Sequence, residues 1–207
     1  MFRVVAACVA AVMLTAPTLA QEPDADLDPI KVVKPNGEVQ TKYPGRGVYG
    51  AVQAGYVDGL DFDQLTLFDG SVLGATLGYD FGLIRIEADY AFRNITFPSD
   101  TIVRTFFGPV RLLGDVDMHT ALANIALDLP LSKRINAYVL GGGGAAFIQD
   151  LGPAEEVFAF QGGGGVSYLA SRSIAIDVGY RYLRTEELQI GEQLETHNAL
   201  FALRFYF

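Results

Sequence analysis

Apolar and polar residues alternate with a period of two through most of this 207-residue chain. The stretch "SIAIDVGYRYL" at 173–183 shows the pattern: isoleucine, valine and tyrosine occupy one set of alternate positions, whereas Asp177 and Arg181 lie on the other. Successive side chains of a β-strand point to opposite faces, so this spacing predicts strands with one apolar and one polar face. The alternation therefore favours an all-β fold.

Eight segments carry this pattern, at 47–57, 70–80, 83–93, 117–128, 134–147, 158–169, 173–184 and 197–207. Their connections alternate between short ones, near 81–82, 130–133 and 170–172, and long ones, at 58–69, 94–116, 148–157 and 185–196. An up-and-down antiparallel sheet has this arrangement, with tight turns at one end and loops at the other. Strands of about 11 residues also match the length of a tilted membrane strand, and closure into a barrel leaves no unpaired edge.

The polar face of these strands separates a membrane barrel from a soluble barrel with the same number of strands. On three of the predicted strands this face carries arginine, aspartate or glutamate. Such a face is unsuited to a dry ligand cavity, but it fits the interior of a small membrane barrel, where charges pair while the apolar face meets lipid. We therefore expect a charge network in the lumen, formed by Arg85, Glu87, Asp89, Asp177, Arg181 and Arg204.

The chain begins with features of an exported protein. Residues 1–20, "MFRVVAACVAAVMLTAPTLA", combine Arg3, an apolar run and small residues before Gln21, which predicts a cleaved secretory signal. Residues 21–46 are rich in proline and charge, so we expect an extended leader without regular structure, followed by the barrel at 47–207. Cys8, the single cysteine, lies in the predicted signal, so the mature chain has no disulfide.

Several short stretches resemble a known family. They are "VYGAVQAGY" at 48–56, "FAFQGGGGVSYLA" at 158–170, "DVGYRYL" at 177–183 and "LFALRFYF" at 200–207. In this order they are similar to the small eight-stranded outer-membrane β-barrels of Gram-negative bacteria, the OmpA-like and opacity-like surface proteins. The resemblance implies an antiparallel transmembrane barrel with short periplasmic turns and four longer extracellular loops.

The same resemblance implies location and partners. The barrel would lie in the outer membrane, against its lipid and lipopolysaccharide, after handling by periplasmic chaperones and the barrel assembly machinery. In this family the last strand is the signal that the machinery reads, and an exposed strand edge can pair with it by strand addition. On this chain the assembly signal corresponds to Phe201, Leu203, Phe205 and Phe207.

Three other groups of residues match known kinds of binding or catalytic site only in part. The glycine runs at 141–144 and 162–165 lack the lysine and Ser/Thr of a phosphate loop, so we expect them side by side in the wall, making room for Arg85, Arg181 and Arg204. Lipid A deacylases carry a His-x-Ser pair. The sequence reads "HTA" from His119 and "HNA" from His197, so alanine replaces the serine in both places. The aspartates at 58, 61, 63 and 69 lack the spacing of a calcium loop. We therefore expect no catalytic, cofactor or metal site.

The charge of the chain reduces the number of possible functions further. The chain has 15 Lys and Arg against 24 Asp and Glu, which argues against nucleic acid as a partner. The acidic surplus lies in the long connections, which disfavours binding to polyanionic surfaces. The sequence predicts a structural and surface-display protein of the envelope. A narrow pore or a ligand-binding surface module is the alternative, and a lipid A-modifying enzyme is less favoured.

Overall fold

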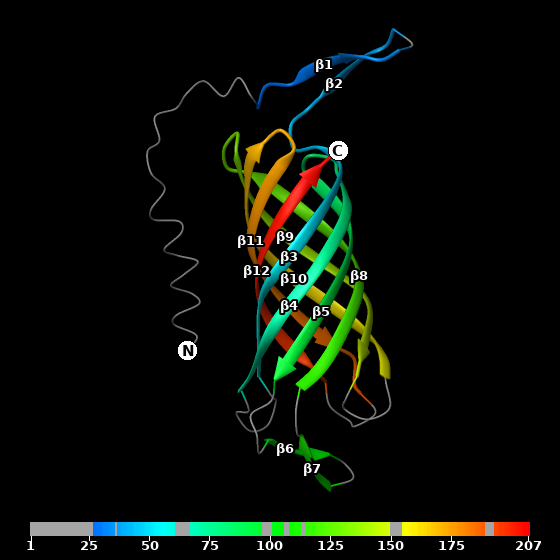
Figure 1. The fold of residues 1–207 in the computed structure, drawn as a ribbon, viewed down its shortest axis with the longest axis vertical. Helices are drawn as coiled ribbons and strands as arrows, with labels where there is room; N and C mark the ends of the chain where they lie inside the picture. Colours follow the sequence, from blue (N-terminus) through cyan, green and yellow to red (C-terminus); the bar gives the residue numbers. More distant parts are fainter. Residues whose placement is uncertain are drawn as a thin grey trace.

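The computed structural model describes residues 27–35, 37–60, 67–96, 101–105, 108–112, 115–149, 155–188 and 193–207. Within them eight antiparallel strands form a closed barrel in the order β10-β11-β12-β3-β4-β5-β8-β9 (Figure 1). The barrel strands are β3 (Gly47–Leu60), β4 (Leu67–Asp80), β5 (Ile84–Thr96), β8 (Asp115–Pro130), β9 (Ile135–Ile148), β10 (Glu155–Ser171), β11 (Ile174–Thr185) and β12 (Glu195–Tyr206). The predicted signal at 1–20 lies outside the described residues.

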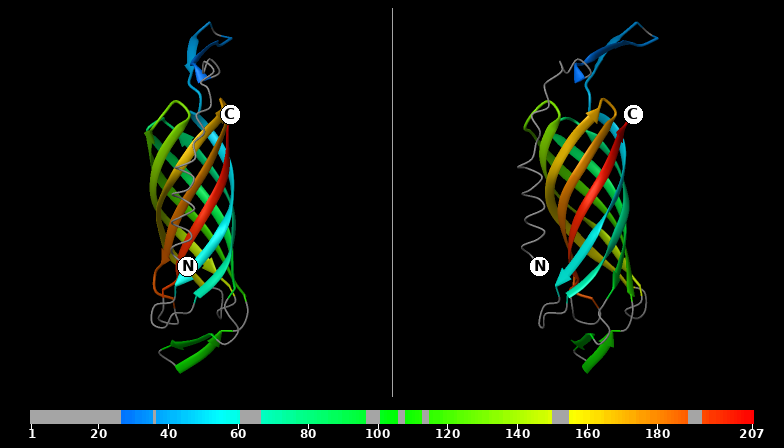
Figure 2. Two further views of the ribbon diagram at one scale, coloured as in Figure 1. Left: turned by 90° about the vertical axis from the view of Figure 1, so that its left-hand side faces the viewer. Right: turned by 60° about the vertical axis from the view of Figure 1, so that its left-hand side comes forward.

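Closure comes from the pairing of the last strand with the first. β12 pairs with β3 from His197 opposite Asp58 to Tyr206 opposite Tyr49, so neither strand leaves an open edge over this length. Two further views show strands tilted around the whole circumference (Figure 2). The predicted fold class is confirmed, and all eight predicted strands are present, some of them extended by up to three residues, as at Glu155.

The two ends of the barrel differ as predicted. The turn end carries the short connections at 81–83, 131–134 and 172–173, and the loop end carries the long ones. In the first turn Gly82 donates its backbone N–H to Asp80 Oδ1 at 2.7 Å and has a φ of 107°, a region that favours glycine. This local geometry allows β4 to reverse directly into β5.

The exterior of the barrel is apolar, and the interior holds buried charged side chains. Leu73, Leu77 and Ile125 face outward and are 64%, 61% and 58% exposed. Exposed aromatic residues lie at both ends: Phe81, Tyr168 and Phe207 at the turn end, and Tyr56 and Phe158 at the loop end. An apolar surface of this extent indicates contact with lipid.

The leader contains regular structure that the sequence analysis did not predict. β1 (Ile30–Val33) pairs with β2 (Val39–Lys42) in a hairpin beyond the turn end (Figure 1). The backbone N–H of Gly37 donates to the carbonyl of Lys34 at 2.9 Å, and Gly37 has a φ of 83°, so the intervening turn suits a glycine. Each strand has only four residues, too few for a period-two pattern to emerge.

A second hairpin lies in the longest connection, between β5 and β8. β6 (Thr101–Thr105) pairs with β7 (Gly108–Leu112), where the sequence analysis expects only a loop. The β-branched residues of "TIVRT" favour a strand. No helix in the described part of the chain is long and apolar enough to cross a membrane.

Candidate functional site

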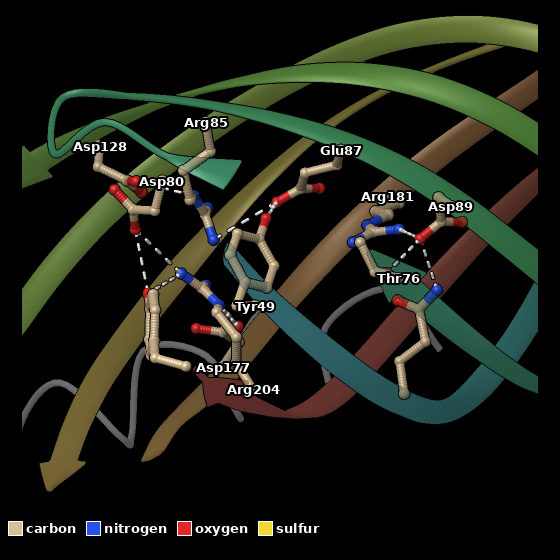
Figure 3. A network of polar contacts seen from close by, with 12 residues as sticks. Tyr49, Thr76, Asp80, Arg85, Glu87, Asp89, Asp128, Asp177, Arg181 and Arg204 are labelled. Atoms are coloured by element: carbon tan, nitrogen blue, oxygen red, sulfur yellow. Dashed lines mark hydrogen bonds and ion pairs between the residues drawn. The ribbon is translucent and has the colours of Figure 1, made fainter. Parts of the chain in front are cut away.

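The lumen collects the buried charges of the described residues. All six predicted lumen residues lie there, each at most 8% exposed, and Asp80, Arg93 and Asp128 accompany them. The set contains four arginines and five carboxylates: Arg85, Arg93, Arg181, Arg204, Asp80, Glu87, Asp89, Asp128 and Asp177. Figure 3 shows all of them except Arg93. Charges withdrawn from water are tolerated when they are paired and hydrogen-bonded, so their partners determine what this site can do.

Asp89 on β5 binds three donors through one carboxylate oxygen, Oδ2. Thr76 Oγ1 and Gln53 Nε2 each donate at 2.8 Å, and the Arg181 guanidinium donates at 2.9 Å. Arg181 belongs to β11, four strands away from β5 in the closed sheet. The ion pair between Arg181 and Asp89 therefore crosses the lumen and ties opposite walls together.

Arg204 on β12 forms a second cluster near the turn end. Its Nε and NH2 donate to Asp177 Oδ2 at 3.2 and 2.6 Å, and its NH1 donates to the Tyr206 hydroxyl at 2.8 Å. Tyr206 in turn donates to Asp80 Oδ2 at 3.0 Å. The guanidinium carbon lies 5.0 Å from the ring centre of Tyr49, close enough for a cation–π contact.

Arg85 on β5 organises a third cluster. Its Nε is 2.7 Å from Asp128 Oδ2 and its NH1 is 3.5 Å from Glu87 Oε1. The Tyr49 hydroxyl donates to the same Glu87 oxygen at 2.6 Å. Because the Tyr49 ring also faces Arg204, this tyrosine links the second and third clusters.

Glycines in the wall admit the large side chains of the lumen. The predicted adjacency of the two glycine runs is confirmed, with Gly141 opposite Gly162. The hydroxyl of Tyr138 lies 2.8 Å from where a Cβ would stand on Gly165, so that space is used by a tyrosine. Gly163 similarly accommodates Arg181, with Cγ at 3.2 Å from such a Cβ. Neither Arg85 nor Arg204 is among the nearest contacts of these glycines, contrary to expectation.

Arg85 reaches the glycine-lined space only indirectly. Its guanidinium carbon lies 5.0 Å from the ring centre of Tyr138, the side chain that the glycines admit. Tyr138 continues the inward phase of β9, but the sequence analysis singled out only charges. The alternation contained the information needed to place this ring in the lumen.

Arg93 is a buried cation of a different kind. It is 1% exposed, and in the described part of the chain no carboxylate lies within ion-pair distance of it. Its Nε donates to Asn198 Oδ1 at 3.1 Å and its NH1 to Thr120 Oγ1 at 2.7 Å. Arg93 continues the inward phase of Arg85 and Asp89 along β5, a signal that the sequence analysis did not use.

Toward the loop end, most of the buried side chains in the lumen are apolar. Buried aliphatic residues from all eight barrel strands and from the last loop form one cluster, the apolar plug: Val57, Val72, Ala91, Ile95, Val116, Met118, Leu122, Ala146, Ile148, Ala159, Leu183, Leu188, Leu194 and Leu200. The sequence analysis did not predict it, because Ile95 and Leu183 lie in the phase that the charges occupy elsewhere on the same strands. The plug gives the loop end a core of buried apolar side chains.

Little free space remains in the lumen. The cavity bordered by Tyr49, Arg85, Tyr138, Arg181 and Arg204 has a volume of ≈ 20 Å³. A cavity needs about 10–15 Å³, measured in this way, to hold one water molecule. The charged part of the lumen therefore has room for about one water, in accord with the expectation that interior side chains fill a barrel of about eight strands.

The two histidines lie on the outer surface, on β8 and β12. His119 shares a hydrogen bond of 2.8 Å with the Tyr90 hydroxyl through Nδ1, and His197 is bonded likewise to Tyr180. β3, β4 and β5 separate the two histidine strands, so the side chains do not meet.

The aspartates near the first loop lie partly outside the described residues, namely at positions 61 and 63. Asp58 and Asp69 face each other in the register of β3 and β4, and Asp69 accepts a hydrogen bond of 3.4 Å from Tyr56. Within the described residues, no three His, Cys, Asp or Glu side chains are grouped to hold a metal ion.

The four residues of the expected assembly signal lie in one row on the outside of β12 and just beyond its end. Phe201 and Phe205 are 48% and 40% exposed, Leu203 is half-buried, and Phe207 is 72% exposed. The alternate residues, among them Arg204 and Tyr206, point into the lumen. This row lies on the outer face of β12, beside the seam with β3, and reaches the turn end at Phe207.

A closed barrel with an apolar exterior, aromatic ends and a charged lumen defines an integral membrane β-barrel. The chain belongs to the outer membrane protein beta-barrel domain family, whose model matches residues 6–207. The protein is therefore an outer-membrane β-barrel, in agreement with the resemblance found in the sequence.

Three solved structures are similar to this chain, and the likeness to the first of them supports the fold. Neisserial surface protein A is 15% identical, with a TM-score of 0.58 over 78% of this chain and 97% of its own. OprG from Pseudomonas aeruginosa is 12% identical, with a TM-score of 0.49 over 78% of this chain and 98% of its own. Ail from Yersinia pestis is 18% identical, with a TM-score of 0.44 over 77% and 99%. No curated protein matches the sequence.

The ion pair across the lumen leads to a stability prediction. Asp89→Asn removes the charge that faces Arg181 and leaves the guanidinium buried without its counter-ion. We expect the free energy of unfolding to fall by about 3–5 kcal/mol, measured by urea titration of the barrel in lipid vesicles. The exposed control Asp69→Asn should change it by no more than about 0.5 kcal/mol.

A double variant separates loss of the pair from loss of packing. Combining Asp89→Asn with Arg181→Met removes both charges, so part of the lost stability should return. Equal, small effects of Asp89→Asn and Asp69→Asn would contradict a structural role for the ion pair.

Proposed function

We propose that this outer-membrane barrel has a structural and surface-display role: it forms a rigid, closed element of the envelope and presents four loops outside the cell. The observation that carries this proposal is the filled lumen. The cavity between the charges has a volume of ≈ 20 Å³, and the apolar plug fills the bore toward the loop end. Such an interior supports rigidity and offers solutes no path. With the lumen filled, the residues that can contact molecules outside the cell are those of the loop end.

The display role requires the loop end to face the medium and the turn end to face the periplasm. Residues 101–105 and 108–112 place Arg104 and Arg111 in the β6–β7 hairpin, whereas Lys31 and Lys42 lie in the leader hairpin at the opposite end. Trypsin cleaves after arginine and lysine, so both hairpins contain cleavage sites. The hairpin that is cut therefore reports which end of the barrel the protease reaches.

Trypsin added to intact cells should cut within β6 and β7 and leave the leader hairpin whole. After the outer membrane is permeabilised, the leader should be cut as well. Fragments identified by mass spectrometry give the result. Cleavage of the leader, but not of β6–β7, on intact cells would reverse the orientation and remove the display role.

The pore alternative is tested by conductance. A barrel of about eight strands is filled by its own side chains, and aqueous channels need roughly sixteen. We expect no stable, large conductance from reconstituted protein in planar bilayers. Reproducible channels that pass sugars, and that change when Arg85 or Arg204 is replaced, would favour the pore over the structural role.

We further propose that the row Phe201, Leu203, Phe205 and Phe207 is the signal for the barrel assembly machinery. Its support is the exposed, lipid-facing position of the row beside the closing seam. Phe207→Ala should slow the appearance of folded, heat-modifiable barrel and increase periplasmic degradation without affecting export. Phe81→Ala, an exposed aromatic change at the same end, is the matched control. Wild-type assembly kinetics of Phe207→Ala would count against the signal.

The remaining parts of the proposal follow from the family. Small barrels of this family are generally non-catalytic, and the separated histidines support the same reading for this chain. Residues 1–20 would direct export and be removed, periplasmic chaperones would carry the chain, and lipopolysaccharide and phospholipid would surround the barrel.

A further inference from the structure

A pocket lies between the leader hairpin and the turn end of the barrel. It has a volume of ≈ 550 Å³, within the range of about 300–1,000 Å³ that small-molecule sites occupy. Its walls come from the hairpin, from the segment that joins it to β3, and from the turn end of the barrel, and they include Val32, Arg46, Val48, Tyr79, Phe81 and Phe207.

The barrel side of this pocket is part of the lipid-facing surface. Val48, Tyr79 and Phe81 are 47%, 44% and 58% exposed, and Phe207 is 72% exposed. The rings of Tyr79 and Phe81 pack against each other with 4.5 Å between centroids. These residues lie where aromatic side chains meet the membrane interface. With the turn end toward the periplasm, as proposed above, the lipids next to them are those of the inner leaflet.

One cationic side chain, that of Arg46, borders the same pocket. The Arg46 guanidinium carbon lies 4.8 Å from the ring centre of Tyr43, and the group covers Gly82 in the β4–β5 turn. Within the described residues no carboxylate lies within ion-pair distance of Arg46, and Asp80, which also borders the pocket, is bonded to Tyr206 and Gly82. An arginine in this setting binds a phosphate well, because its fork of N–H donors matches the phosphate oxygens.

We propose that this pocket binds an anionic phospholipid of the inner leaflet, with its phosphate on Arg46 and an acyl chain against Val48, Tyr79 and Phe207. Val32 and Thr41 of the leader hairpin cover the bound lipid from the periplasmic side. The leader thereby holds the turn end of the barrel against the membrane surface.

The absence of tryptophan from the chain allows a direct test of contact. Val32→Trp places one indole in the pocket, and Val33→Trp places one on the opposite face of the same strand. Each variant is reconstituted in nanodiscs of phosphatidylglycerol brominated on its acyl chains. We expect the Val32→Trp fluorescence to be quenched several-fold more than that of Val33→Trp. Equal quenching of the two, or none of either, would overturn the proposal.

The role of the cation is tested separately. Arg46→Gln should reduce the phosphatidylglycerol retained on the detergent-extracted protein about tenfold, the change that about 1.4 kcal/mol produces. Lys133→Gln, an exposed basic change at the same end, should leave retention almost unchanged. Native mass spectrometry counts the bound lipid, and heat-modifiable mobility checks that each barrel is folded.

A second lipid separates headgroup recognition from simple coverage by acyl chains. In nanodiscs of phosphatidylcholine, the wild type and Arg46→Gln should retain similar, smaller amounts of lipid. Equal retention of both lipids by the wild type, or unchanged phosphatidylglycerol on Arg46→Gln, would exclude an anionic site at Arg46. These outcomes do not depend on whether the loops display a binding surface.

Discussion

The structure depends on one constraint: inside a bilayer, every backbone N–H and C=O group must find its partner within the protein. The pairing of β12 with β3 meets this constraint by closing the sheet. Closure with eight strands also fixes a narrow bore, so the inward side chains must fit together rather than line a channel. The filled lumen is thus a consequence of strand number as much as of residue type.

The side chains in the lumen pack in two different ways along its length. Near the turn end, arginines and carboxylates pair across the bore. Arg85 and Arg204 also stack on the rings of Tyr138 and Tyr49. Near the loop end, aliphatic side chains form the apolar plug, like the core of a soluble protein. Arg93 lies between the two zones, held by the neutral acceptors Asn198 and Thr120. The plug fills the bore at the end that carries the long loops.

Much of the candidate site was predictable, because a strand's period of two assigns each residue to a face before any contact is known. Arg85, Glu87 and Asp89 were placed in the lumen in this way, and the structure buries all three. Arg93 obeyed the same phase and was missed because it lies at the end of the predicted strand. The partners were not predictable, since Arg181 and Asp89 meet only after the sheet has closed.

The sequence by itself determined the class of fold, the number of barrel strands, the alternation of turns and loops, and which faces of the strands point outward. These properties are local: they follow from the direction of successive side chains and from the residues that allow a turn. Only the tertiary structure decided which charges pair across the bore, where the lumen changes from ionic to apolar, and how the leader hairpin meets the turn end. Those contacts join residues far apart in the chain, and barrel closure alone brings them within reach of one another.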